Sequence, residues 1–338
     1  MLLEYVILTV MWLALIAYAV LGGADFGAGI WDFLAFGKRA ERRRRLITQA
    51  IGPVWEANHV WLIFLLVGLF TAFPLAFSTL STALFLPFTL ILFGIVLRGA
   101  AFIFRTYASD MQWFSEVWSR VFGLASAVTP FLLGASAAAV ASGRIRVQAN
   151  GFVQTDLGSG WTTPFALTIG AMAVCLCAVL AAIYLTVEAE SAHDDELVEV
   201  FRLRAIVAGA ITAVLGALGL LLSPTEAPLL WNGLLAHAVP VVIATMLVGL
   251  GAAVALYVRR YRWARILIIV ETAFLLGSWG VSQLPYIIPP DVTVSNAAAP
   301  TAMLWLLLLS TIVGMLLLIP ALWFLFSVFK GNQKARST

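Results

Sequence analysis

Long apolar runs separated by short polar segments dominate the sequence. Nine such runs can be drawn, at about 5–35, 51–74, 80–104, 119–141, 163–187, 204–223, 229–257, 263–283 and 302–328. Each is long enough to cross a hydrocarbon core of about 30 Å as a helix that rises about 1.5 Å per residue. The pattern therefore predicts an all-α polytopic membrane protein with nine transmembrane helices.

The amino-acid composition supports a membrane protein and excludes several other classes of protein. The chain is 62% hydrophobic and 11% charged, against about 25% charged in an ordinary soluble domain. The first run has no basic region before it and no small-residue cleavage site, so we interpret it as a true span. No phosphate-binding glycine loop, HExxH or CxxC is present, which leaves no basis for an autonomous ATPase, zinc protease or thiol oxidoreductase.

The positive charge lies almost wholly on one side of the predicted membrane. If the segment KRAERRRR (38–45) is cytoplasmic, so are all of the 20 basic residues except Arg144 and Arg146. The positive-inside rule then puts the N-terminus outside and the C-terminus in the cytoplasm. Because this charge follows the membrane topology, we do not expect a nucleic-acid partner.

Three polar segments complete the predicted topology. Loops 143–161 and 284–300 are rich in residues that stop helices and lie outside. The acidic stretch 188–201 is predicted as a cytoplasmic surface helix, with His193 solvated. Cys175 and Cys177, two apart in one span, point to different faces and are interpreted as packing residues.

We expect a single integral membrane domain over residues 1–338. Spans one to four (1–141) and five to eight (163–283) would form two four-helix units. The ninth helix (302–328) would then be peripheral.

Ionisable residues inside spans are costly and are therefore candidate functional residues. They are Asp25 and Asp32 in the first span, Glu56 and His59 in the second, Arg98 in the third, His237 in the seventh and Glu271 in the eighth. A lone histidine such as His237 is more often a hydrogen-bonded helix contact than a haem ligand. Glu271, near the bilayer centre, is either a second relay or an interface residue.

The acids, imidazole and guanidinium of the first three spans fall in one cytoplasm-facing layer. One interpretation is a structural polar network of Asp25, Glu56 and Arg98 that fixes helix register, to which Asn58 and Glu271 are added as candidates. The other is a proton path through Glu56, Asp25, Asp32 and His59, because carboxyl and imidazole groups on adjacent helices can pass protons through water. No metal site and no residue of a chemical step is expected.

Two features surround this layer. Gly23 and Gly27 flank Asp25 in a small-xxx-small pattern that lets helix backbones approach closely. Trp55 and Trp61 flank the polar residues of the second span and are either packing residues or weak candidates for a cofactor contact.

Four segments together resemble subunit II of the cytochrome bd ubiquinol oxidases. They are GGADFGAGIWDFL, ERRRRLITQAIGPVWEANHVWLIF, FGIVLRGAAFIFR and LPYIIPPDVTVSNAAAP. The resemblance runs from the first span to the loop before the ninth. It implies two four-helix bundles with a peripheral helix and a multi-pass subunit of the bacterial cytoplasmic membrane.

The resemblance also implies a partner and a reaction. In that family, subunit I carries two b-type haems, one d-type haem (or a b-type replacement at the oxygen site) and the quinol-oxidising loop. The heterodimer reduces dioxygen to water with electrons from ubiquinol or menaquinol and takes protons from the cytoplasm. A structural quinone and a small single-span subunit are further expectations, as is contact with membrane lipid. No haem is expected on this chain.

The family motif maps onto several positions of this sequence. Glu56 stands where members carry an acid proposed for a proton channel, Asp25 is the acid of the glycine-rich motif, and Arg98 is the arginine before GAAFIF. His59 stands where members carry glutamine. Two other functions remain open at this stage, a proton-coupled secondary transporter and a purely structural membrane scaffold.

Overall fold

The computed structural model describes the backbone of residues 2–37, 40–107, 112–148, 151–154, 158 and 160–335. Side chains are described for these residues except 49, 51–57, 106–107, 112, 322–323 and 325–335. The candidates Trp55 and Glu56 therefore lie in the described helix backbone but outside the described side chains.

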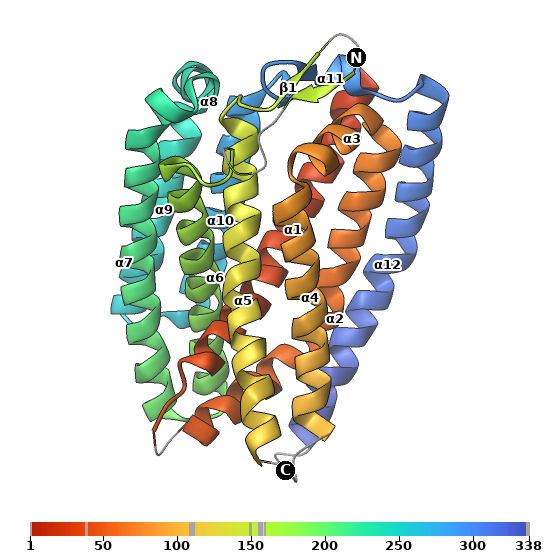
Figure 1. Cartoon of the computed structure of the whole chain (residues 1–338). Coiled ribbons are helices and arrows are strands. Elements are labelled where there is room, and N and C mark those ends of the chain that lie inside the picture. The colour runs from red at the N-terminus through yellow and green to blue at the C-terminus, as the bar shows by residue number, and fades with distance from the viewer. Residues whose placement is uncertain are drawn as a thin grey trace.

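Nearly all of the described chain is helical (Figure 1). The helices are α1 (Leu2–Phe33), α2 (Ala40–Ala72), α3 (Pro74–Ala83), α4 (Phe85–Tyr107), α5 (Gln112–Ala141), α6 (Pro164–Ser191), α7 (Asp195–Glu226), α8 (Pro228–Gly233), the π-helical turn Leu234–Ala238, α9 (Val239–Tyr257), α10 (Tyr261–Gln283), α11 (Val294–Ala297) and α12 (Thr301–Ala335). Among the described residues, eight helices are long and apolar enough to span a membrane, or up to nine if one bent pair counts as a span. The predicted all-α membrane class is confirmed.

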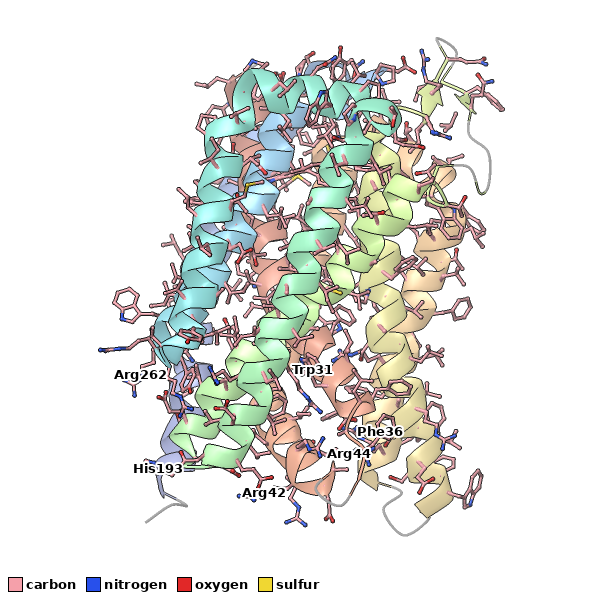
Figure 2. All side chains as sticks on the ribbon, turned by 90° about the vertical axis from the view of Figure 1, so that its left-hand side faces the viewer. Trp31, Phe36, Arg42, Arg44, His193 and Arg262 are labelled. Atoms are coloured by element: carbon pink, nitrogen blue, oxygen red, sulfur yellow. The ribbon has the colours of Figure 1, made fainter. Side chains whose placement is uncertain are left out.

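The bundle has two distinct ends. At the end that we name the hairpin end lie two small antiparallel sheets, β1 (Arg146–Val147) with β2 (Val153–Gln154) and β3 (Tyr286–Ile288) with β4 (Val292–Thr293). At the opposite end, the basic end, lie the start of α2 and the turns that join α6 to α7 and α9 to α10. Figure 1 shows α1 beginning at the hairpin end and α12 finishing at the basic end. Figure 2 shows Arg42, Arg44, His193 and Arg262 at the basic end.

The second span begins earlier than its apolar run. The arginines that were expected in a loop are helical from Ala40 onward, because alanine, glutamate and arginine are good helix formers and no proline or glycine interrupts residues 40–50. The span ends at Ala72, where Pro74 starts α3 after a bend of 116°. A proline is tolerated in the first turn of a helix because its missing N–H has no partner there.

The acidic stretch 188–201 does not form a separate surface helix, which corrects the prediction. Its first residues end α6 and its last begin α7. The turn between them places His193 at φ 55°, and Asp194 caps α7 because its Oδ1 accepts a hydrogen bond of 3.1 Å from the Leu197 N–H. His193 is exposed, as expected for a solvated residue.

The seventh span is not a continuous α-helix. α8 passes into the π-helical turn that contains His237, and α9 follows with Pro240 in its first turn. Proline removes one backbone donor, and π-helical turns accommodate such local disruptions of the α-helical ladder. His237 is exposed on this chain, and its expected role as a hydrogen-bonded helix contact stays a prediction.

α1 is deeply enclosed at the basic end. Every residue from Gly22 to Asp32 is buried, and α1 packs against α2, α5 and α6. Its backbone approaches α6 so closely that a Cβ on Gly27 would lie 1.8 Å from the Cys177 carbonyl oxygen. α12 lies at the edge of the bundle beside α2 (Figure 1). The division into units 1–141 and 163–283 stays a prediction.

An ion pair joins the two hairpin loops. Arg146 Nε donates to Asp291 Oδ2 over 2.8 Å, and the same oxygen accepts the Val147 N–H over 2.9 Å. The pKa of Asp291 is lowered by the bond from Arg146 and by the Val147 amide, and burial opposes this only partly. We expect Asp291→Asn to lower the hydrogen-exchange protection of the Val147 amide several-fold.

The sign of the pH dependence follows from this lowered pKa. The stabilisation is present above the unfolded aspartate pKa of about 3.9 and is lost as the pH falls through the lower folded value. Protection at Val147, corrected for the intrinsic rate, should therefore decline below about pH 4 in the parent protein. Glu226→Gln is the matched control because it removes only the partner of Arg144 in the same loop. Equal protection in the parent and Asp291→Asn proteins would contradict the assignment.

Candidate functional site

A buried ion pair between α1 and α4 forms the centre of the site. Asp25 is 1% exposed and Arg98 is 2% exposed. Arg98 Nη1 donates to Asp25 Oδ2 over 2.7 Å, and Nη2 donates to Oδ1 over 2.5 Å. This two-point contact matches the planar guanidinium to the carboxylate and is among the stronger hydrogen-bond arrangements in proteins.

Two further helices complete the hydrogen bonding of this pair. Asn58 of α2 donates its Nδ2 to Asp25 Oδ2 over 2.7 Å. Arg98 Nε donates a hydrogen bond of 2.9 Å to Ser126 Oγ of α5, and Ser126 Oγ in turn donates one of 2.7 Å to the Phe122 carbonyl oxygen. Four helices thus converge on one charge pair. We name Asp25, Asn58, Arg98 and Ser126 the Asp25 cluster.

Aromatic rings cover the guanidinium from both sides. The Arg98 Cζ lies 4.9 Å from the ring centroid of Phe26 and 4.8 Å from that of Phe122. A cation over an aromatic face gains electrostatic attraction, and the gain increases when water is excluded. The rings therefore hold the charged group in place while they separate it from lipid.

A second ion pair lies closer to the basic end. Arg105 of α4 donates its Nη1 to Asp32 Oδ2 over 2.5 Å, and the Arg44 Nε lies 3.8 Å from Asp32 Oδ1. The Arg105 Cζ lies 4.8 Å from the Phe122 ring centroid, so Phe122 separates the two guanidinium groups. Asp32 is 1% exposed.

The two pairs repeat because the helices run in the same direction. Asp32 follows Asp25 by two helical turns, Arg105 follows Arg98 by the same spacing, and both pairs join residues 73 apart in sequence. The result is a ladder of compensated charges along α1 and α4. Both partners of the ion pair are buried only at the Asp25 level, since Arg105 and Arg44 are partly exposed.

Close helix packing positions Asp25. Gly23 and Gly27 face α6, where a Cβ on Gly23 would lie 2.7 Å from Leu180 Cδ1. Gly29 faces Ser126, whose Oγ would lie 2.1 Å from an added Cβ. Small residues at helix crossings allow backbones to approach closely in a membrane. The glycine motif thus brings α1 near enough to α5 and α6 for Asp25 to be enclosed.

The other sequence candidates lie on α2 and α10. His59 is half-buried on α2. Trp61 packs in the apolar cluster with Tyr18 and Phe26, and its Nε1 is buried without a hydrogen-bond partner among the described residues. Glu271 of α10 faces α9, where an added Cβ on Gly249 would lie 2.7 Å from its Oε1. The predicted inclusion of Glu271 in one network with Arg98 and Asn58 stays a prediction.

Sequence reasoning did not single out Arg105, Ser126 or Phe122. Arg105 had a usable signal, its seven-residue spacing from Arg98, which matches the spacing of Asp25 and Asp32. Ser126 and Phe122 had none, because serine and phenylalanine are common in apolar helices. Within the described part of the chain, no three of His, Cys, Asp and Glu lie together in a way that could hold a metal ion.

Comparison with known proteins finds sequence similarity along nearly the whole chain. A family model described as cytochrome bd terminal oxidase subunit II matches residues 3–329. A Bacillus subtilis chain assigned as subunit II of a cytochrome bd menaquinol oxidase is 23% identical over 97% of this chain and 95% of its own length. The Escherichia coli cytochrome bd-I ubiquinol oxidase subunit 2 is 28% identical over 39% of this chain and 35% of its own.

The fold also matches a solved structure. A chain of the bd oxidase from Geobacillus thermodenitrificans superposes with a TM-score of 0.79 at 24% identity, covering 98% of this chain and 100% of that one. At this identity the match establishes the fold.

Proposed function

The chain belongs to the cytochrome bd terminal oxidase subunit II family, and from this premise we propose that its own task is to deliver protons to the oxygen site of its partner. As a member of that family, it is a multi-pass subunit of a quinol oxidase in the bacterial cytoplasmic membrane, and subunit I is its partner. The complex is an oxidoreductase. Family membership removes the basis for the transporter alternative.

The cofactors of the reaction are proposed for the partner. Subunit I would carry two b-type haems and a d-type haem or its b-type replacement, together with the quinol site. These groups supply the electron transfer and the reduction of dioxygen. The residues of this chain would supply protons and would hold subunit I in its working arrangement.

Charge distribution supports a cytoplasmic location for the basic end. Arginines of the α2 start, of early α7 and of the α9–α10 turn all lie there, whereas Arg144 and Arg146 lie at the hairpin end. Positive residues concentrate on the cytoplasmic side of membrane proteins. On this orientation the Asp25 cluster is reached from the cytoplasm, which is the source of protons for the proposed path.

The observation that carries the proposal is the fully buried charge at Asp25 and Arg98. Charged groups inside a membrane are costly and commonly mark ion or proton pathways. Asp25 receives charge-assisted bonds from Arg98 and a further bond from Asn58, so its carboxylate is fixed in position. We propose that it acts as a fixed negative charge that stabilises a proton on adjacent water, with Glu56 as the carrier and with Asp32 and His59 along the same route.

A purely structural role is the second candidate, and the same hydrogen bonds favour it. The bonds that Asn58 and Arg98 donate to Asp25, together with the bond from Arg98 to Ser126, join four helices and so fix their register. Buried ion pairs can specify structure without adding stability. The test must therefore remove the charge without removing the packing.

We expect Glu56→Gln and the double variant Asp25→Asn/Arg98→Gln to assemble with normal haem content but to consume oxygen about tenfold more slowly or worse, because a positioned proton-transfer group typically contributes about 10²–10⁴ in rate. The double variant replaces both charged groups by neutral amides, so no isolated buried charge remains. Oxygen consumption with excess quinol, divided by haem content, is the measurement.

Arg262→Gln is the control, since Arg262 is exposed at the basic end (Figure 2). If both test variants bind haem fully and consume oxygen at the parent rate, the proton-delivery role is wrong and the structural role is supported.

A further inference from the structure

A cavity that the Asp25 cluster does not explain lies between α1, α2, α6 and α10. Its volume is about 60 Å³. Alanines of α1, α2 and α6 form much of the wall, and the polar groups that line it are Asp25, Tyr184, Glu188 and Arg265. One water needs about 10–15 Å³ of such space, so the cavity has room for a few water molecules.

Several residues that line the cavity lie one after another along a single face of α6. Ala181, Tyr184 and Glu188 are spaced by three and four residues and so share one face of the helix. Ala181 lies level with Gly27, since a Cβ on Gly27 would be 2.8 Å from the Ala181 Cβ. Glu188 follows Ala181 by seven residues, which places it about 10 Å nearer the basic end. The cavity thus extends from the level of Asp25 toward the basic end of the bundle.

Two opposite charges line this cavity without forming an ion pair. Among the described residues, neither Glu188 nor Arg265 makes a salt bridge within 4.0 Å. The Arg265 Cζ instead lies 5.8 Å from the Tyr184 ring centroid, and all three side chains are half-buried. Charged groups that face one space without contact are typically bridged by water. The lining therefore favours a hydrated cavity over an empty one.

We propose that this cavity is a hydrated vestibule in which Glu188 takes up protons at the basic end and passes them through water to the Asp25 cluster. The inference rests on the proposed proton-delivery function and names its uptake residue. In each cycle the Glu188 carboxylate accepts a proton from outside water, releases it to vestibule water and returns to its anionic form. Asp25 keeps its bonds to Arg98 and Asn58 while the proton moves on water beside it.

Hydration can be tested without measuring activity. In the intact complex, Ag⁺ is applied to the Ala28→Cys variant, whose new thiol lines the cavity, and to Ala182→Cys as a matched control. Ala182 is fully buried on α6 outside the cavity. Mass spectrometry of each cysteine peptide gives the rate at which Ag⁺ blocks the thiol. We expect blocking at position 28 to be about tenfold faster or more, because thiol reaction requires access. Equal rates would overturn the vestibule.

The proton role is tested in the same complex with Glu188→Gln. Oxygen consumption per haem should fall about tenfold, as for loss of a proton-transfer group, while the control Glu190→Gln keeps the parent rate because Glu190 is exposed outside the cavity. A further outcome is parent activity in Glu188→Gln while Glu56→Gln and Asp25→Asn/Arg98→Gln are slow. That result would contradict proton uptake by Glu188 but would still agree with proton delivery by this chain. Parent activity in all three would overturn both.

Discussion

Replacing Arg98 by alanine is expected to prevent stable assembly of the complex. The change leaves the Asp25 carboxylate, 1% exposed, without the two donors that compensate its charge. Removing one partner of a buried ion pair costs about 3–5 kcal/mol, a large part of the stability of a typical domain. The measurement is the yield of complex with subunit I after size-exclusion chromatography, together with its thermal unfolding.

A second variant makes this prediction specific to charge. Asp25→Asn/Arg98→Gln leaves no isolated buried charge, so its yield should return toward that of the parent protein. Arg262→Ala, an exposed arginine at the basic end, should assemble normally. An Arg98→Ala complex as stable as the parent would mean that water or another cation compensates Asp25, and the ion-pair account would then be wrong.

Gly27→Ala is expected to be nearly as damaging although it adds one methyl group. The new Cβ would lie 1.8 Å from the Cys177 carbonyl oxygen and 2.4 Å from its carbonyl carbon. Both are backbone atoms, so no side-chain rotation can relieve the overlap and α1 must move away from α6. Overpacking of this kind typically costs about 1–3 kcal/mol, and we expect the upper end of that range here.

The effect should be seen as a lower unfolding temperature of the complex and a lower yield. Gly277→Ala of α10 is the matched control, since nothing lies within 4 Å of its added Cβ, and it should be neutral or slightly stabilising because alanine favours helices. Similar behaviour of the two variants would show that α1 and α6 are not held at this close distance.

The transmembrane helices could be predicted because apolar length alone indicates a span. The runs at 119–141 and 263–283 lie within α5 and α10, and the run at 163–187 lies within α6 except for Thr163, which caps that helix. Helix ends were predicted less well. α2 starts at Ala40 although its apolar run starts at 51, because charged residues with good helix propensity extend a helix beyond the membrane without changing its hydrophobic signal.

The candidate site, too, could be predicted from the sequence only in part. A buried acid and a buried arginine require partners, so Asp25 and Arg98 could be identified as important from their positions in apolar spans. Their partner on α5 could not, because a local pattern does not say which face of α5 meets Arg98. Glu271 was grouped with them for its charge, yet its helix places it against Gly249 of α9. Burial of a charge can thus be predicted from sequence more readily than its partner.

We propose that this chain carries protons from the cytoplasm to the oxygen site of subunit I. The most direct measurement is proton uptake during a single oxygen reaction of the fully reduced complex, followed with a pH-indicator dye while haem oxidation is recorded. In Glu56→Gln and in Asp25→Asn/Arg98→Gln we expect uptake to slow about tenfold or more relative to the parent complex. Uptake at the parent rate in both assembled, haem-loaded variants would contradict the account.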